Sequence, residues 1–198
     1  MNHKVADRVC ALSALALAAQ AAVRAADESP PQALVEGALA TLNVVAAALF
    51  WRRRAPTAVA PRADLLMAGV SLLAAGFLLR DARPHFGMVS ASAFAVAASL
   101  AALALIALGP SFSILPARRG VVARGPYAWV RHPAYAAELA MATIAAAAAF
   151  RVTSGCLWLL TLGAMVARIR IEERFLRRGE GYAEYAARVR YRIVPGVF

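Results

Sequence analysis

Long apolar runs, separated by short polar segments, make up most of the chain. At a rise of about 1.5 Å per residue, a helix of about 17 to 22 apolar residues crosses a hydrocarbon core of about 30 Å. The pattern therefore predicts an all-α fold, a polytopic integral membrane bundle of about five to six transmembrane helices. The runs are Val9–Ala26, Ala33–Trp51, Leu65–Leu79, Gly87–Leu108, Ala134–Phe150 and Val152–Ala167.

The C-terminal part of the pattern predicts two further features. Only Arg151 separates the last two runs, which favours a tight antiparallel helical hairpin. After the hairpin, aromatic and apolar side chains recur at helical spacing among arginines, at Tyr182, Tyr185, Val189 and Ile193. This spacing is typical of an amphipathic helix at the membrane interface, where its arginines contact anionic lipid headgroups.

The first run has two interpretations. Lys4 and Arg8 precede an apolar stretch that is followed by small-residue triplets, as in a secretory signal peptide. Residues 1–25 are therefore either such a signal or a first transmembrane helix, and we favour the helix. Under both interpretations, we expect residues 1–108 to form N-terminal transmembrane helices and residues 109–198 to carry the chemistry.

The charge distribution predicts the orientation of these helices. The 22 basic residues exceed the 11 acidic ones, and the formal net charge is +11. The arginines cluster between apolar runs, and no known nucleic-acid-binding motif accompanies them, so we expect no nucleic acid partner. With the N-terminus inside and alternating spans, 18 basic residues lie inside and 4 outside. The positive-inside rule then places the loop before the hairpin and the basic tail in the cytoplasm.

Several common kinds of site are not predicted. Cys10 and Cys156 lie in apolar segments without CxxC spacing, so we expect neither a disulfide framework nor a zinc site. The carboxylates and histidines do not follow a metal-ligand pattern, and we expect no metal. A GxGxxG fingerprint on a strand–helix turn, typical of soluble dinucleotide-binding folds, is also missing from the sequence.

The segment Arg124–Glu138, RGPYAWVRHPAYAAE, joins a polar loop to an apolar helix. Ionisable groups at a membrane boundary carry a cost unless they line a cavity or bind a ligand. Pro133 is placed where a helix begins, so His132 precedes a helix N-terminus, which attracts anions. Tyr135 and Glu138 are three residues apart and share one helix face. The segment therefore predicts a binding site.

Two adjacent carboxylates, Glu172 and Glu173, follow the last run among Arg168, Arg170 and Arg174. Two glutamates are poorly placed against a membrane surface that itself carries negative charge. We expect them to face a pocket, where they hold an ammonium group or the ribose hydroxyls of a cofactor. On a helix, neighbouring side chains point about 100° apart.

Intramembrane polar residues leave two other functions open. Glu36 and Asn43 are seven residues apart and share a helix face. Such groups are typical of a transport pathway, although hydrogen bonds between helices are the simpler interpretation, which we favour. A small transporter normally shows internal repeat symmetry, which the two halves of this chain lack. A non-enzymatic membrane accessory protein is the other alternative, and it leaves the dense loop motif unexplained.

The loop motif, the hairpin, the tandem glutamates and the segment GYAEYAARVRY together resemble the isoprenylcysteine carboxyl methyltransferase family, related to phospholipid N-methyltransferases. The resemblance covers about Gly109–Pro195. It implies an integral membrane enzyme of the bacterial inner membrane, with its active site facing the cytoplasm, that uses S-adenosylmethionine. The implied acceptor is a lipophilic small molecule or isoprenoid, prenylcysteine-like and methylated on a carboxylate or thiol. Membrane lipids are the other expected partner, and no obligate protein partner is expected.

The resemblance also implies roles for particular residues. Arg131 orients the loop or meets the cofactor carboxylate, and His132 contacts or positions the cofactor. Helix geometry adds Glu138 to these two as a catalytic candidate, a base if the acceptor is an amine. No role is assigned to Tyr182 or Tyr185, because the spacing before them is slightly shorter than usual for the family. The implied cofactor pocket consists of Gly125, Tyr127, His132, Pro133, Tyr135, Glu172 and Glu173.

Overall fold

The computed structural model describes residues 3–59, 61, 70, 73–79, 86–113 and 117–198. Of the predicted helix Leu65–Leu79, residues 65–69 and 71–72 lie outside the described residues, and residues 73–79 are helical. The helices are α1 (His3–Asp27), α2 (Pro30–Arg52), α4 (Met88–Leu108), α5 (Pro133–Ala149), α6 (Val152–Leu176) and α7 (Tyr182–Arg188). The remaining elements are the 3₁₀ turns η2 (Gly109–Ser111) and η3 (Gly125–Ala128) and the strands β1 (Ala58–Val59) and β2 (Ala117–Arg118).

The predicted all-α membrane bundle is confirmed. In the part of the chain that the structure describes, four helices are long and apolar enough to cross a membrane: α1, α2, α4 together with η2, and α6. Helix α5 is apolar but shorter, with 17 residues. The protein is therefore a multi-pass integral membrane protein.

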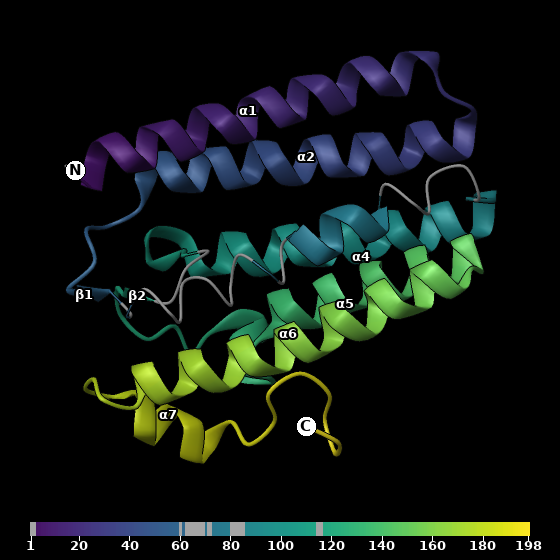
Figure 1. Ribbon diagram of the computed structural model, residues 1–198. Coiled ribbons are helices and arrows are strands. Elements are labelled where there is room, and N and C mark those ends of the chain that lie inside the picture. The colour runs from purple at the N-terminus through teal and green to yellow at the C-terminus, as the bar shows by residue number, and fades with distance from the viewer. Residues whose placement is uncertain (1–2, 60, 62–69, 71–72, 80–85, 114–116) are drawn as a thin grey trace.

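The helices pack in chain order. The pairs α1–α2, α4–α5 and α5–α6 are antiparallel, whereas α2 and α4 run parallel, since Gln32 at the start of α2 bonds to Phe86 before α4 and Arg54 after α2 bonds to Pro110 after α4. Helix α1 lies along α2, which contacts α4, and α5 packs between α4 and α6 (Figure 1). The predicted hairpin is present, because α5 ends at Ala149 and α6 begins at Val152. Phe150, in the left-handed conformation with φ 46°, ends α5 and reverses the chain.

Small residues explain why the helices approach closely. On α1 the buried residues include Ala11, Ala14, Ala18 and Ala21, spaced three or four apart on one face. Larger side chains such as Leu12, which is 61% exposed, point outwards. Alanine lets two helix backbones approach, so packing in lipid relies on close contact between small side chains. The outward leucines and valines are suited to contact with lipid tails.

The two intramembrane polar residues of α2 have different partners. Glu36 is buried and accepts two hydrogen bonds from the Arg24 guanidinium of α1, at 3.0 and 3.2 Å. The expected bond between helices is thus confirmed for Glu36. For Asn43 it is wrong, because its amide donates to the Leu39 carbonyl of its own helix at 2.9 Å. A short side chain reaches the carbonyl one turn back more easily than a neighbouring helix.

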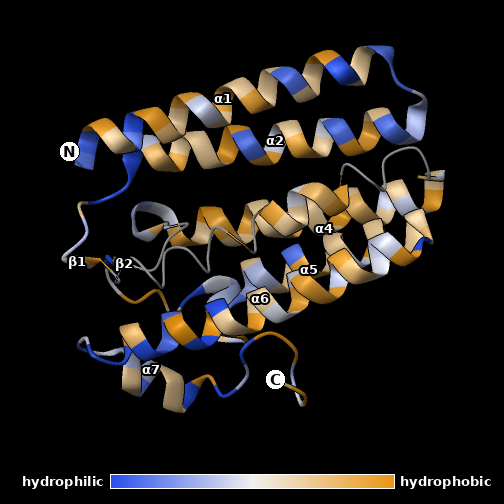
Figure 2. Ribbon diagram, in the orientation of Figure 1, coloured by the Kyte–Doolittle hydropathy of each residue, from blue (hydrophilic) through white to orange (hydrophobic). Residues whose placement is uncertain are grey.

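The polar segments gather at one end of the bundle. Figure 2 shows hydrophilic residues around β1, β2 and α7, next to the ends of α2, α4 and α6. There β1 pairs with β2 in an antiparallel ribbon, with Ala58 opposite Arg118. The ribbon ties the segment after α2 to the loop between α4 and α5. It was not predicted, because two residues per strand produce no detectable alternation.

The C-terminal tail is helical only over Tyr182–Arg188, shorter than predicted. Val189 is extended, with φ −100° and ψ 93°, although Val189 and Ile193 are both buried as their spacing predicted. The helix stops because the carbonyls of Val189 and Arg190 accept hydrogen bonds from the Arg131 side chain. The apolar side chains of the tail thus pack against the rest of the protein.

Candidate functional site

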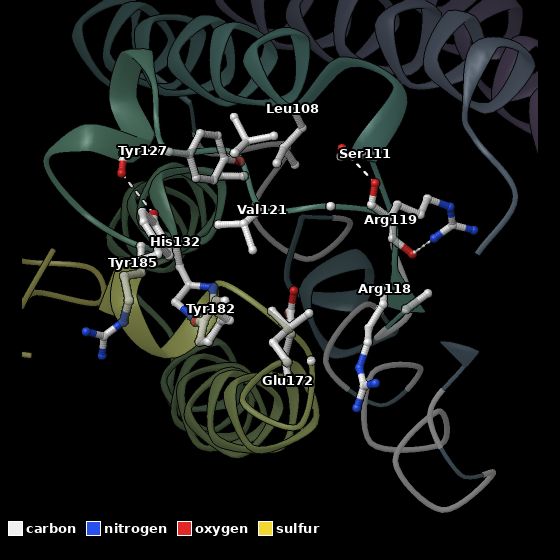
Figure 3. A pocket seen from close by; sticks show the side chains of 18 of the residues that line it. Leu108, Ser111, Arg118, Arg119, Val121, Tyr127, His132, Glu172, Tyr182 and Tyr185 are labelled. Atoms are coloured by element: carbon white, nitrogen blue, oxygen red, sulfur yellow. Dashed lines mark hydrogen bonds between the residues drawn. The ribbon is translucent and has the colours of Figure 1, made fainter. Parts of the chain in front are cut away.

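A cavity of about 630 Å³ lies at the polar end of the bundle. Figure 3 shows side chains from four parts of the chain around it: Leu108 of α4, Tyr127 of the loop, Glu172 of α6 and Tyr182 of α7. A volume of this size is typical of pockets for small molecules and cofactors. The polar and aromatic residues that line it are Thr57, Ser111, Ser113, Arg118, Arg119, Tyr127, Arg131, His132, Tyr135, Glu172, Arg178, Glu180, Tyr182 and Tyr185.

Gly125 begins the 3₁₀ turn that brings Tyr127 to the cavity. Its φ is +60°, and a Cβ at this position would lie 3.8 Å from the side chain of Ala107 on α4. Glycine suits this left-handed turn packed against a helix. Gly125 itself is not among the lining residues, whereas Tyr127 is. The hydroxyl of Tyr185 donates to the Tyr127 carbonyl at 2.8 Å and connects this turn to α7.

Helix α5 begins as predicted, with His132 just before it and Pro133 in its first turn. The imidazole of His132 stacks on the ring of Tyr135, with 5.3 Å between centroids and 7° between planes. The Tyr135 hydroxyl donates to Oε2 of Glu172 at 2.6 Å. His132, Tyr135 and Glu172 line the cavity, and Pro133 does not. The loop motif and the α6 motif, predicted to share a site, are therefore in direct contact.

Glu173 is the centre of a buried ion-pair network. Its Oε1 accepts a hydrogen bond from Nε of Arg131 at 2.6 Å and lies 3.3 Å from Nε2 of His132. Its Oε2 accepts one from Nε of Arg192 at 3.0 Å. The Glu173 side chain is 4% exposed and is not among the cavity-lining residues. A carboxylate this deeply buried requires such partners to remain charged.

Arg131 joins the loop to the tail. Besides its bond to Glu173, its Nη1 donates to the carbonyls of Val189 and Arg190 at 2.8 and 2.9 Å. The loop backbone adds two bonds of its own, since the N–H groups of residues 131 and 132 donate to the carbonyls of residues 191 and 192. These contacts correspond to the first role implied for Arg131, orientation of the loop.

The tandem glutamates diverge as expected for neighbours on a helix. Glu172 lines the cavity, and Glu173 faces the loop and the tail. Arg168, one turn before Glu172, holds its guanidinium 4.7 Å above the Tyr135 ring and interacts electrostatically with Glu172 and Glu138. Glu138 is half-buried and is not among the lining residues. The structure therefore places this catalytic candidate next to the site rather than in it.

Two arginines of the loop were not predicted as site residues. The Arg118 guanidinium donates to the Phe175 carbonyl at 3.1 Å and lies over the Phe175 ring, so it caps the end of α6. Gly179 makes room for it, since a Cβ there would lie 3.1 Å from Arg118 Cδ. Arg119 is buried beside the cavity. The two arginines lie between Pro116 and Gly120, which is a possible signal of a site. Their charge alone predicts only the orientation of the helices in the membrane.

Tyr182, like Tyr185, lines the cavity and has no role assigned from the sequence. Its side chain is buried, and its hydroxyl has no hydrogen-bond partner among the described residues. Burial, followed by the negative charges of Glu173 and Glu172, raises the pKa of Tyr182. Burial and the charge of Glu172 likewise raise the pKa of Tyr127. Both hydroxyls are therefore neutral at physiological pH and can donate a hydrogen bond.

The cavity thus combines two carboxylates, those of Glu172 and Glu180, with an imidazole–phenol stack, neutral hydroxyls and several guanidinium groups. Over the described ranges, no group of three or more His, Cys, Asp or Glu residues could hold a metal ion. Cys10 and Cys156 are both free thiols. The arrangement is suited to an organic ligand that carries both positive and negative groups.

Comparison with known families identifies this part of the chain. Residues 89–178 match the isoprenylcysteine carboxyl methyltransferase family. This segment belongs to that family. Over this segment the match supports the family predicted from the motifs and indicates a membrane methyltransferase. The match begins inside α4, earlier than the expected Gly109, and ends before α7. No curated protein matches the chain at a significant level.

Proposed function

We propose that this protein is an S-adenosylmethionine-dependent methyltransferase whose cavity receives the cofactor on the cytoplasmic side of the bacterial inner membrane. The observation that carries the proposal is the meeting of two distant motifs in one cavity. Tyr127, His132 and Tyr135 of the loop and Glu172 of α6 line the same space, and the Tyr135 hydroxyl bonds directly to Glu172. All of them lie within the segment that matches the methyltransferase family.

The chemistry of the lining residues fits this cofactor. The Glu172 carboxylate can accept hydrogen bonds from ribose hydroxyls or an ammonium group. The Tyr182 side chain also lines the cavity, and its buried hydroxyl has no partner in the described residues. The stacked rings of His132 and Tyr135 offer a flat aromatic surface. When bound, S-adenosylmethionine supplies a methyl group on a sulfonium, whose S–CH₃ bond breaks as the acceptor oxygen or sulfur bonds to that carbon.

The protein's own contribution is alignment and exclusion of water. An anionic carboxylate or thiolate acceptor needs no strong base, and good alignment alone can supply about 7–11 kcal/mol of the barrier. His132 is held between Glu173 and the Tyr135 ring, which favours a positioning role over that of a base. An amine acceptor needs a base, and Glu172 is better placed for that than Glu138, because Glu172 lines the cavity.

The walls of the cavity favour a lipophilic acceptor. Leu105 and Leu108 extend the lining onto α4, a helix long and apolar enough to cross a membrane. Such a surface can receive an isoprenoid or acyl chain from the bilayer. Four arginines, Arg118, Arg119, Arg131 and Arg178, line the same cavity, which by the positive-inside rule favours the cytoplasm, where the cofactor is available.

The proposal is tested by calorimetry on protein purified in detergent. We expect both S-adenosylmethionine and S-adenosylhomocysteine to bind with dissociation constants below 1 mM, about −4 kcal/mol. The absence of heat with either ligand at millimolar concentration would refute the cofactor assignment. Transfer of a radiolabelled methyl group to a prenylcysteine, a fatty acid, a small thiol and a phospholipid amine then distinguishes the acceptor classes. We expect carboxylates to be the best acceptors.

A further inference from the structure

The cavity wall is supported by helices outside the family match. Ala11 of α1, Phe50 of α2 and Phe112 form a buried cluster, against which Leu105 and Leu108 pack. The two leucines line the cavity, and so do the serines on either side of Phe112. Residues of α1 and α2 therefore lie directly behind the wall of the proposed binding site.

A buried ion pair holds this cluster. The Asp7 carboxylate of α1 pairs with the Arg53 guanidinium at the end of α2, and their side chains are only 10% and 11% exposed. The same guanidinium lies over the Phe50 ring at 4.6 Å. Phe50 meets Phe112 edge-on, with 5.1 Å between centroids. The rings of Phe50 and Phe112 thus connect the ion pair to the segment that carries the wall serines.

Hydrogen bonds continue the connection into the wall itself. The Arg119 side chain donates to the Arg54 carbonyl at 2.8 Å and to Oγ of Ser113 at 2.7 Å. The Ser111 hydroxyl donates to the Arg119 carbonyl at 3.3 Å. The N–H of Arg54 donates to the carbonyl of Pro110 at 2.9 Å. The backbone that follows α2 is therefore bonded to both sides of the wall.

Without the Asp7 carboxylate, the positive charges of Arg53 and Arg119 in this region would not be offset. Burial, and after it the positive charge of Arg53, lower the pKa of Arg119, and the negative charge of Asp7 acts in the opposite direction. Two guanidinium groups near each other at low exposure repel, because little water screens them. The Asp7 carboxylate, paired with Arg53, offsets that repulsion.

We propose that Asp7 is a positioning residue of the binding site: by neutralising Arg53 beside Arg119, it keeps the wall formed by Ser111, Ser113 and Arg119 in the shape that receives the ligand. The identity of that ligand rests on the proposed function, whereas the effect on the wall does not. The proposal requires α1 in the working protein.

The chain offers a matched control. Asp7→Asn and Glu36→Gln each remove one carboxylate from an ion pair between α1 and α2. Glu36 lies roughly 25 Å along α2 from Arg53, at 1.5 Å per residue, and does not line the cavity. Melting temperature measures the general loosening of the helix pair. Amide hydrogen exchange of residues 111–113 and 117–120 measures the wall, and calorimetry measures cofactor affinity.

We expect both variants to melt at a lower temperature than the natural protein. Only Asp7→Asn should speed exchange in the wall and weaken S-adenosylmethionine binding, by about tenfold. The double variant Asp7→Arg/Arg53→Asp, which restores the pair with reversed charges, should recover both properties. The double variant also tests the role of Asp7 if Asp7→Asn does not fold.

Three results would overturn the proposal. They are unchanged wall exchange in Asp7→Asn, an equal change in Glu36→Gln, and failure of the double variant to recover the wall. Hydrogen exchange needs no ligand, so it tests Asp7 even if the natural protein binds no S-adenosylmethionine. In that case the proposed function fails and the structural role of Asp7 is judged separately.

Discussion

The two faces of α6 near its C-terminal end carry the same residue type and have opposite environments. Glu172 lines the cavity and accepts one hydrogen bond, from Tyr135. Glu173, the next residue, faces the loop and the tail and contacts Arg131, His132 and Arg192. A step of about 100° on one helix thus separates a surface open to a ligand from a closed ion-pair network.

The residues that stabilise the fold and those available for binding thus lie on different faces of α6. Cationic partners surround the carboxylate of the closed face, because an unpaired buried charge would destabilise the fold. The cavity face keeps a hydroxyl, that of Tyr182, without a partner in the described residues. Unpaired polar groups in a cavity are a cost to folding that a bound ligand can remove. Substitutions on the two faces should therefore have separable effects.

The largest effect is expected on the closed face. Glu173→Gln leaves the buried charge of Arg131 without its carboxylate, and breaking a buried pair in this way typically costs about 3–5 kcal/mol. Thermal unfolding in detergent, followed by circular dichroism, should show a strongly lowered melting temperature. A variant that melts like the natural protein and loses only cofactor binding would contradict the assignment of Glu173 to the scaffold.

On the cavity face, the corresponding substitution should act on binding. Glu172→Gln removes a charge that faces the ligand but keeps an oxygen for the Tyr135 hydroxyl. Hydrogen bonds to charged groups contribute about 1.5–3 kcal/mol, so affinity for S-adenosylmethionine should fall by about 10- to 100-fold. The melting temperature should change little. If it drops as far as in Glu173→Gln, the two faces are not functionally distinct.

Two tyrosines of α7 sharpen the comparison with the smallest possible change, the loss of one oxygen. Tyr182→Phe removes the hydroxyl without a partner in the described residues and should weaken cofactor binding about two- to tenfold without lowering stability. Tyr185→Phe removes the bond to the Tyr127 carbonyl and should cost about 1 kcal/mol of unfolding free energy. Calorimetry and thermal unfolding should both be measured on the two variants, so that each variant is the control for the other.

The smallest effect is expected for Glu138. This residue lies outside the cavity lining, so Glu138→Gln should leave cofactor affinity and methyl transfer within about twofold of the natural protein. The measurement is the initial rate of label transfer to the best acceptor. A loss of tenfold or more with unchanged affinity would instead support Glu138 as a base.

Much of the fold could be predicted because its signals are local. Apolar runs predicted α1, α2, α4, α5 and α6, and the single residue between the last two predicted the hairpin. The extent of α6 was underestimated. The apolar run ends at Ala167, but the helix continues to Leu176, since its charged residues pair with the loop and the tail instead of ending in water.

The site was predicted in part, because its motifs are also local signals. Tyr127, Arg131, His132, Tyr135 and Glu172 do line one cavity, whereas Gly125, Pro133, Glu138 and Glu173 lie around it. A motif places residues near each other along the chain, but their direction depends on the turn that carries them. Gly125 and Pro133 shape that turn and the start of α5, and their side chains have no polar group to offer.

The sequence by itself determined the membrane bundle, the position of the helix start at Pro133, the family and the neighbourhood of the site. Hydrophobic periodicity and backbone restrictions act over a few residues, so they can be recognised without knowing the partners. Only the tertiary structure decided that Glu172 faces the ligand while Glu173 binds the scaffold, and that Asp7 stands behind the cavity wall. Ion pairs such as these join residues about 40 or more positions apart, and packing alone brings them together.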